Sequence, residues 1–97
     1  MTNDKVNEVL ESHIKRLEDA GYQSRRYDVS AVGPVFSSEA RRHILWMANE
    51  ALKIPAEKLE KKMRWLGFIQ GVAWVVDGFS IDMLKKQNMP DEEKTGG

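Results

Sequence analysis

The sequence predicts an all-α protein with an antiparallel hairpin of two helices, an amino-terminal helix packed across it and a short carboxy-terminal helix. Two observations support this fold class: apolar residues recur at helical spacing in long segments, and glycine or proline separates those segments. Residues 1–89 are predicted to be a single helical domain, because a chain of 97 residues suits one core. Residues 90–97 are polar, follow a proline and are predicted to be a disordered tail.

The first helix is predicted over residues 4–20. Its apolar positions fall on one stripe, with charged residues on the opposite face, and they are Val6, Val9, Leu10, Ile14 and Leu17. Thr2 or Asn3 can accept a hydrogen bond at its start, and Gly21 can end it in the left-handed conformation. We therefore expect a surface helix that packs by one face.

Residues 22–36 lose the helical period and include a Gly-Pro pair at positions 33 and 34. Their tyrosines, valines and phenylalanine favour an ordered loop, and loops of about 15 residues in compact domains are often functional. The sequence leaves open whether residues 27–32 are extended, because no partner strand is evident.

The second helix is predicted to begin after Ser37 or Ser38, either of which can cap it, with Glu39 near the positive end of the helix dipole. Pro55 suits the first position of a third helix over residues 55–77. The connection between the two helices is short, and this predicts that they are antiparallel neighbours.

The segment 63–76 is the longest apolar run and is apolar on nearly every side of a helix, so we expect it to be covered on nearly every side. Gly67 and Gly71 each cost roughly 1 kcal/mol of helix stability, which predicts that another backbone approaches them closely. We expect a homo-oligomer built on this helix. The predicted contact residues are Trp65, Gly67, Phe68, Gly71, Val72, Trp74 and Val75.

Gly78 is predicted to end the third helix, and Ser80 to cap a short helix over residues 81–87. Ile81 and Leu84 would then fold back on the hairpin. The polar groups Arg64, Gln70 and Asp77 need partners if they are buried, and we expect them to bridge helices or subunits.

The composition excludes several function classes. Fifteen basic and fifteen acidic residues cancel, which disfavours a nucleic-acid-binding protein. The absence of cysteine excludes a disulfide framework, a thiolate zinc site and a catalytic thiol. The start of the chain has no signal core, and the apolar run is too short to span a bilayer. We expect a soluble, unprocessed, cytoplasmic protein that does not contact the membrane.

No arrangement of residues indicates catalysis, a metal site or a cofactor. His13 and His43 lie at the edges of apolar stripes and are interpreted as packing residues. The only candidate ligand site combines arginine with tyrosine, a pairing that can hold phosphate and stack on a base; surface ion pairs are the alternative. Its residues are Tyr22, Arg25, Arg26, Tyr27, Arg41 and Arg42.

Three stretches between residues 43 and 89 carry a resemblance. They read His-Ile-Leu-Trp-Met-Ala-Asn-Glu-Ala-Leu, Glu-Lys-Lys-Met-Arg-Trp-Leu-Gly-Phe-Ile-Gln-Gly-Val-Ala-Trp and Ser-Ile-Asp-Met-Leu-Lys-Lys-Gln-Asn-Met. This half of the chain resembles a group of short proteins of tailed phages and prophages with a Met-Arg-Trp-Leu-Gly-Phe-Ile-Gln-Gly core. The resemblance implies a small phage accessory protein that acts in the bacterial host. The helical-hairpin layout also resembles phage sponge proteins that sequester cyclic nucleotide immune signals, as an analogy of architecture.

From this we expect a non-enzymatic binding protein that counteracts a host process, with a nucleotide signal as the preferred ligand. Two alternatives stay open. One is a protein–protein inhibitor of a host enzyme such as a nuclease or polymerase. The other is a small DNA-binding regulator, which the zero net charge and the lack of a recognition-helix turn disfavour.

Overall fold

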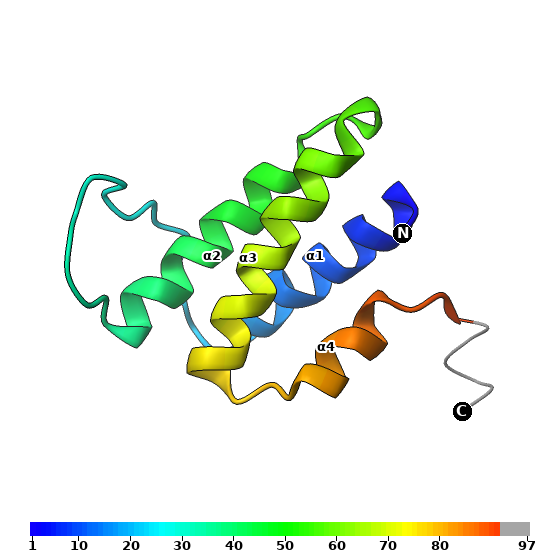
Figure 1. Ribbon diagram of the computed structural model, residues 1–97. Helices are drawn as coiled ribbons and strands as arrows, with labels where there is room; N and C mark the ends of the chain where they lie inside the picture. Colours follow the sequence, from blue (N-terminus) through cyan, green and yellow to red (C-terminus); the bar gives the residue numbers. More distant parts are fainter. Residues whose placement is uncertain (92–97) are drawn as a thin grey trace.

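The structure is a computed structural model that describes residues 1–91, and every regular element in that range is helical (Figure 1). The elements are α1 (Asn3–Asp19), α2 (Ser37–Leu52), a short 3-10 turn (Ala56–Lys58), α3 (Leu59–Asp77) and α4 (Ile81–Asn88). The predicted all-α class is confirmed for these residues. The predicted tail falls outside them from residue 92 onward, and Asp91 forms an ion pair with Lys5 at 3.0 Å.

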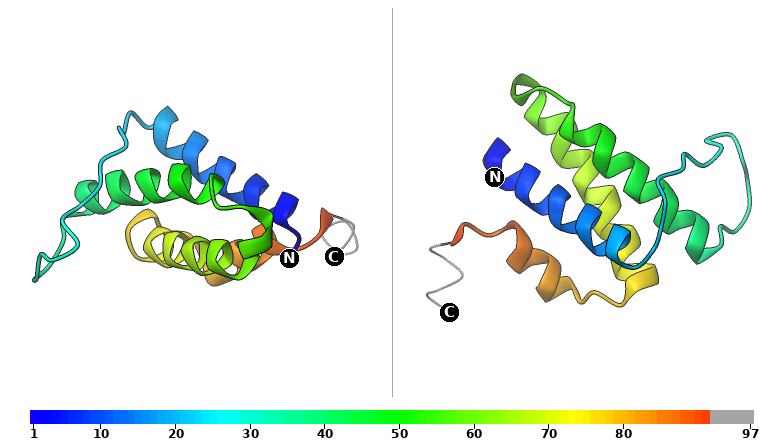
Figure 2. Two further views of the ribbon diagram at one scale, coloured as in Figure 1. Left: turned by 90° about the horizontal axis from the view of Figure 1, so that it is seen from above. Right: turned by 180° about the vertical axis from the view of Figure 1, so that it is seen from behind.

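The core lies where α2 packs against both α1 and α3. α1 and α3 also contact each other, and the view from above in Figure 2 shows α1 lying over one side of the pair of α2 and α3. Each fully buried aliphatic side chain contributes about 1.5–3 kcal/mol to folding. The buried apolar residues of these three helices are Val6, Val9, Leu10, Leu17, Ile44, Leu45, Ala48, Ala51, Leu66, Ile69 and Ala73.

Both ends of α1 and the carboxy-terminal end of α3 agree with the prediction. The Thr2 hydroxyl accepts a hydrogen bond from the backbone N–H of Lys5 at 3.1 Å, and Gly21 follows α1 with a φ of 92°. Gly78 ends α3 with a φ of 74°, in the left-handed region that favours glycine. Ser80 caps α4 as expected, because its side chain accepts from the N–H of Met83.

The predicted serine cap of α2 is wrong. The helix begins at Ser37 itself, and the capping position belongs to Phe36, which is extended and makes no side-chain cap. The chain turns into the helix one residue earlier than the serine pattern suggested, so both serines lie inside the first turn. Glu39 accepts from Arg42 at 2.7 Å in that turn.

The predicted start of the third helix at Pro55 is also wrong. Pro55 is extended and is followed by the 3-10 turn, which the N–H of Lys58 closes by donating to the Pro55 carbonyl at 2.9 Å. Lys58 then departs from helical geometry, with φ −108° and ψ 41°. The α-helix proper therefore starts at Leu59.

The expectation that α3 is covered on nearly every side is wrong for the single chain. Phe68 and Trp74 are 54% and 53% exposed, and Val75 is 72% exposed. A methyl group at Gly67 or Gly71 would meet no neighbouring segment within 4 Å, so the backbone contact predicted for these glycines is absent within the described chain. Only the face with Leu66, Ile69 and Ala73 packs inward, which leaves one side of α3 open.

Side-chain hydrogen bonds join α3 to α1 and α4. The Nζ of Lys62, which is 1% exposed, donates to the side-chain oxygens of Asn3 and Asn7 at 2.8 and 2.9 Å. The amides of Gln70 and Asn88 bond reciprocally at 2.8 and 3.1 Å. Gln70 therefore bridges α3 and α4 as predicted, whereas Arg64 is exposed.

The short helix α4 packs against α1 and buries Leu84. Ile81, which we expected to fold back with Leu84, is 54% exposed. It lies in the first turn of α4, away from the side on which Leu84 and the Gln70–Asn88 pair dock. The expectation for Ile81 is therefore wrong.

Candidate functional site

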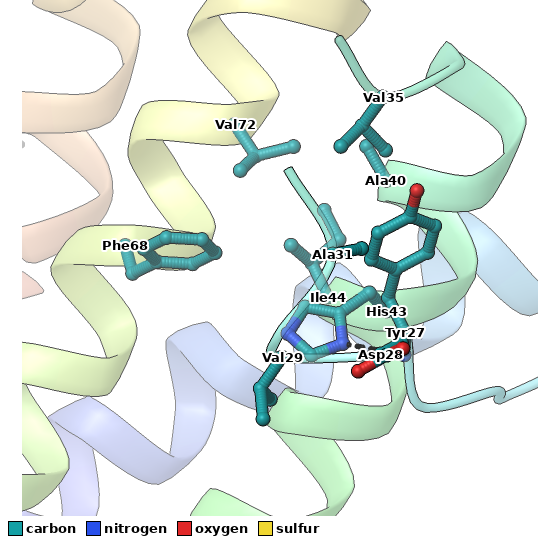
Figure 3. Close-up of a pocket in the computed structure, with 10 residues that line it drawn as sticks. All are labelled: Tyr27, Asp28, Val29, Ala31, Val35, Ala40, His43, Ile44, Phe68 and Val72. Carbon is teal, nitrogen blue, oxygen red and sulfur yellow. Dashed lines mark hydrogen bonds between the residues drawn. The ribbon is translucent and has the colours of Figure 1, made fainter. Parts of the chain in front are cut away.

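The loop of residues 22–36 projects outward beside α2 (Figure 1), and some of its side chains line an open pocket together with residues of α2 and α3 (Figure 3). The volume of the pocket is about 320 Å³, near the lower end of the range for small-molecule sites. Its walls are mostly apolar. The lining residues are Tyr27, Asp28, Val29, Ala31, Val35, Ala40, His43, Ile44, Phe68 and Val72.

His43 brings a hydrogen-bond donor to this apolar pocket. The backbone N–H of Tyr27 donates to Nδ1 of His43 at 3.1 Å, which ties the loop to α2. Burial, followed by the nearby charge of Arg26, lowers the pKa of His43, so the ring is neutral at pH 7. The proton of a neutral ring whose Nδ1 accepts must sit on Nε2. Among the described residues this Nε2–H has no partner, and it is available to a ligand.

The His43 ring contacts two aromatic rings, those of Phe68 and Trp46. The imidazole meets the Phe68 ring edge-on, with centroids 6.4 Å apart, and stacks on Trp46 at 5.7 Å. Figure 3 shows the His43 ring between Phe68 and Tyr27. The Arg26 guanidinium lies 5.2 Å above the Trp46 ring, in a cation–π contact. The positive charge of Arg26 is thereby held close enough to His43 to act on its pKa.

Local hydrogen bonds order the loop. The carboxylate of Asp28 accepts from the backbone N–H and the hydroxyl of Ser30 at 2.9 and 2.7 Å. These bonds lower the pKa of Asp28. The N–H of Arg25 donates to the carbonyl of Arg42 at 3.2 Å and anchors the start of the loop to α2. Asp28 keeps a negative charge on one side of the pocket, so an anionic ligand group is favoured only on the arginine side.

The six predicted ligand residues do not converge. Tyr27 lines the pocket, whereas Arg26 lies over Trp46 outside the lining, and the exposed Arg25 precedes them on the loop. Arg42 is neutralised by Glu39 at 2.7 Å. Tyr22 and Arg41 belong to a different cluster. Of the six predicted residues, only residues 25–27 therefore remain as candidates for binding a ligand in or beside the pocket.

The second cluster is a structural hub around Asp77. Its two carboxylate oxygens accept from Arg16 of α1 and from Arg41 of α2, each at 2.6 Å. Arg41 also donates to the Tyr22 hydroxyl at 3.0 Å and to the Val76 carbonyl at 2.8 Å. The bond to Asp77 is the main cause that raises the pKa of Arg41. Asp77 therefore bridges three helices, as predicted for it.

The predicted contact residues of α3 have different environments. Trp65 and Val72 are half-buried beside the core, and Phe68 forms a wall of the pocket. The exposed members are Gly67, Phe68, Gly71, Trp74 and Val75. Sequence reasoning missed His43 and Phe68 as pocket residues, because it interpreted both as packing groups. The signal for His43 was an aromatic ring at the edge of an apolar stripe, next to Trp46.

No group of three or more histidine, aspartate or glutamate side chains within residues 1–91 could hold a metal ion. No helix in this range is long and apolar enough to cross a membrane. Comparison with known protein families, with curated proteins and with solved structures gave no match.

Proposed function

We propose that the protein is a phage-encoded, non-enzymatic binding protein that acts in the cytoplasm of the infected bacterium and sequesters a nucleotide signal of the host. The resemblance of residues 43–89 supports the phage origin. The pocket between the loop, α2 and α3 supports small-ligand binding, because it has an apolar interior and one donor on His43 that is free among the described residues. The cation of Arg26 lies outside the lining, over Trp46.

The chemistry of the pocket favours a planar ring joined to an anionic group. The ring would lie against Phe68 and Tyr27, with an acceptor atom directed at Nε2 of His43. The phosphate would lie on Arg25 and Arg26, away from the Asp28 carboxylate that lines the pocket. The proposed activity is sequestration of the nucleotide and not its turnover.

Calorimetry with linear and cyclic nucleotides tests this function. Replacement of Arg25 and Arg26 by alanine removes charge-assisted hydrogen bonds worth roughly 1.5–3 kcal/mol each, reduced by exposure to solvent. Affinity should fall at least tenfold while helicity stays unchanged. Arg42→Ala is the matched control, since Glu39 already neutralises this arginine, and it should bind like the wild type.

Two outcomes contradict the proposal. A wild-type protein that binds no nucleotide in the panel contradicts it directly. A double variant that binds as tightly as the wild type shows that Arg25 and Arg26 do not hold the phosphate. Phe68→Ala tests the contact with the base separately, because loss of the ring should weaken binding and leave the phosphate contacts intact.

A second candidate function is inhibition of a host protein, and one observation favours it. A shallow hollow of about 420 Å³ continues from the pocket along α3, lined by apolar groups that include Val35, Phe68 and Val75. Apolar surface of this kind is typical of protein interfaces. Titration of purified host nucleases and polymerases, with enzymatic activity as the readout, distinguishes this function: inhibition without nucleotide binding supports it.

A further inference from the structure

The outer face of α3 is apolar and uncovered. Met63, Phe68, Trp74 and Val75 are between 38% and 72% exposed on this helix. In Figure 1 no other element lies in front of α3. Phe68 and Trp74 alone expose on the order of 100 Å² each. With Met63 and Val75 the patch reaches the few hundred Å² at which apolar surface on a monomer marks an interaction site.

Gly67 and Gly71 lie one turn apart in this face, and the chain itself gives no reason for them. The glycines with positive φ in the described range are Gly21, Gly33 and Gly78, so residues 67 and 71 have backbone conformations that alanine adopts freely. A methyl group at either position would meet nothing within 4 Å. Alanine would also stabilise the helix. What glycine offers here is room for a second backbone to approach α3 closely.

We propose that this face binds a second copy of the chain, with two α3 helices crossing in an antiparallel pair between Gly67 and Gly71. In such a pair, Gly67 of each copy lies against Gly71 of the other. The same symmetry places the exposed Arg64 opposite Trp74, and this pairs a cation with an indole ring. The formal net charge of +0 means that two copies do not repel each other.

The centre of this pairing differs from the proposed ligand site, although Phe68 belongs to both surfaces. Gly67, Gly71 and Trp74 are absent from the lining of the pocket. The helical period places Gly67 and Trp74 roughly 100° or more around the helix axis from Phe68 and Val72. Substitutions at Gly71 therefore change the pairing without changing the lining of the pocket, and they separate the two proposals.

Gly71→Ala gives the sharpest test, because two properties should change in opposite directions. Analytical ultracentrifugation at micromolar concentration should show the wild type as a dimer of the 11.1 kDa chain. Gly71→Ala should raise the melting temperature of dilute, monomeric protein by a few degrees. The same variant should weaken association by roughly tenfold or more, since the methyl group separates the two backbones.

Val75→Lys and Val32→Lys form a matched pair of controls. Both valines are exposed, at 72% and 98%, but Val75 lies on the proposed interface and Val32 on the loop. A lysine in the last turn of α3 suits the helix dipole, so folding should survive. Val75→Lys should abolish the dimer, and Val32→Lys should leave it intact.

A wild type that stays monomeric up to hundred-micromolar concentration overturns the proposal, and leaves the face for a different protein. Unchanged association of Gly71→Ala or of Val75→Lys also overturns it.

Discussion

His13 should make the stability of the protein sensitive to acid. Its ring is 1% exposed. Its Nδ1 accepts from the Arg16 guanidinium at 2.9 Å, so the proton of the neutral ring lies on Nε2, which donates to the Gln87 side-chain oxygen at 3.1 Å. A second proton would have to sit on Nδ1, facing a cation. Burial and the charge of Arg16 lower the pKa of His13 from 6.5 to about 4, although Gln87 and Asp77 oppose the change.

The sign and size of the effect follow from proton binding. Above pH 6.5 His13 is neutral in both the native and the unfolded chain, so its titration takes nothing from the free energy of unfolding. Between pH 6.5 and about 4 the unfolded chain binds a proton that the native chain does not, and stability falls. Below pH 4 both states are protonated. A change from 6.5 to about 4 corresponds to roughly 3 kcal/mol, at about 1.4 kcal/mol per pH unit.

Urea unfolding of the wild type and of His13→Gln at several pH values measures this loss. Glutamine does not titrate, and changes elsewhere in the protein cancel in the difference between the two proteins. The wild type should lose roughly 3 kcal/mol more than the variant as the pH falls from 6.5 to 4. Equal losses refute the reasoning, as does an NMR titration that places the pKa of His13 near 6.5.

Two further predictions concern the ion pairs of Asp77 and the caps of the helices. Asp77→Asn should lower the free energy of unfolding by about 2–3 kcal/mol, because it weakens two charge-assisted bonds in a mostly buried cluster. Thermal denaturation measures this loss, and a loss below about 1 kcal/mol would show that Asp77 does not hold the three helices together. Thr2→Ala should cost about 1 kcal/mol through loss of the cap of α1. Ser37→Ala should change stability by less than about 0.5 kcal/mol, because Ser37 caps nothing, and chemical denaturation of this pair shows whether the two hydroxyls differ.

The local signals in the sequence predicted the helices well, because they act over a few residues. Thr2, Gly21 and Gly78 end or begin helices where their chemistry indicates. The two serines at the start of α2 led to a wrong prediction of its cap, because any of three neighbouring residues could hold the capping position and only the path of the loop decides between them. The start of α3 was set by the turn after Pro55, which proline alone does not specify.

The candidate site was less accessible from sequence, because it depends on contacts between distant segments. Tyr27 and His43 are joined by a backbone-to-ring bond that no local pattern encodes. The arginines looked equivalent in the sequence, yet Asp77 and Glu39 engage Arg41 and Arg42. Which cations stay available for a ligand is decided by the acidic partners that the fold brings to them.

The amine of Lys62 restricts how α1 can be placed on the rest of the protein. Its two partners, Asn3 and Asn7, are one helical turn apart and both belong to α1. If α1 slid by a turn in either direction, at least one amide oxygen would move out of reach and the buried ammonium would lose a bond that the apolar core cannot replace. An arbitrary amphipathic helix with the same apolar stripe could not substitute for α1, because the lysine admits a single register.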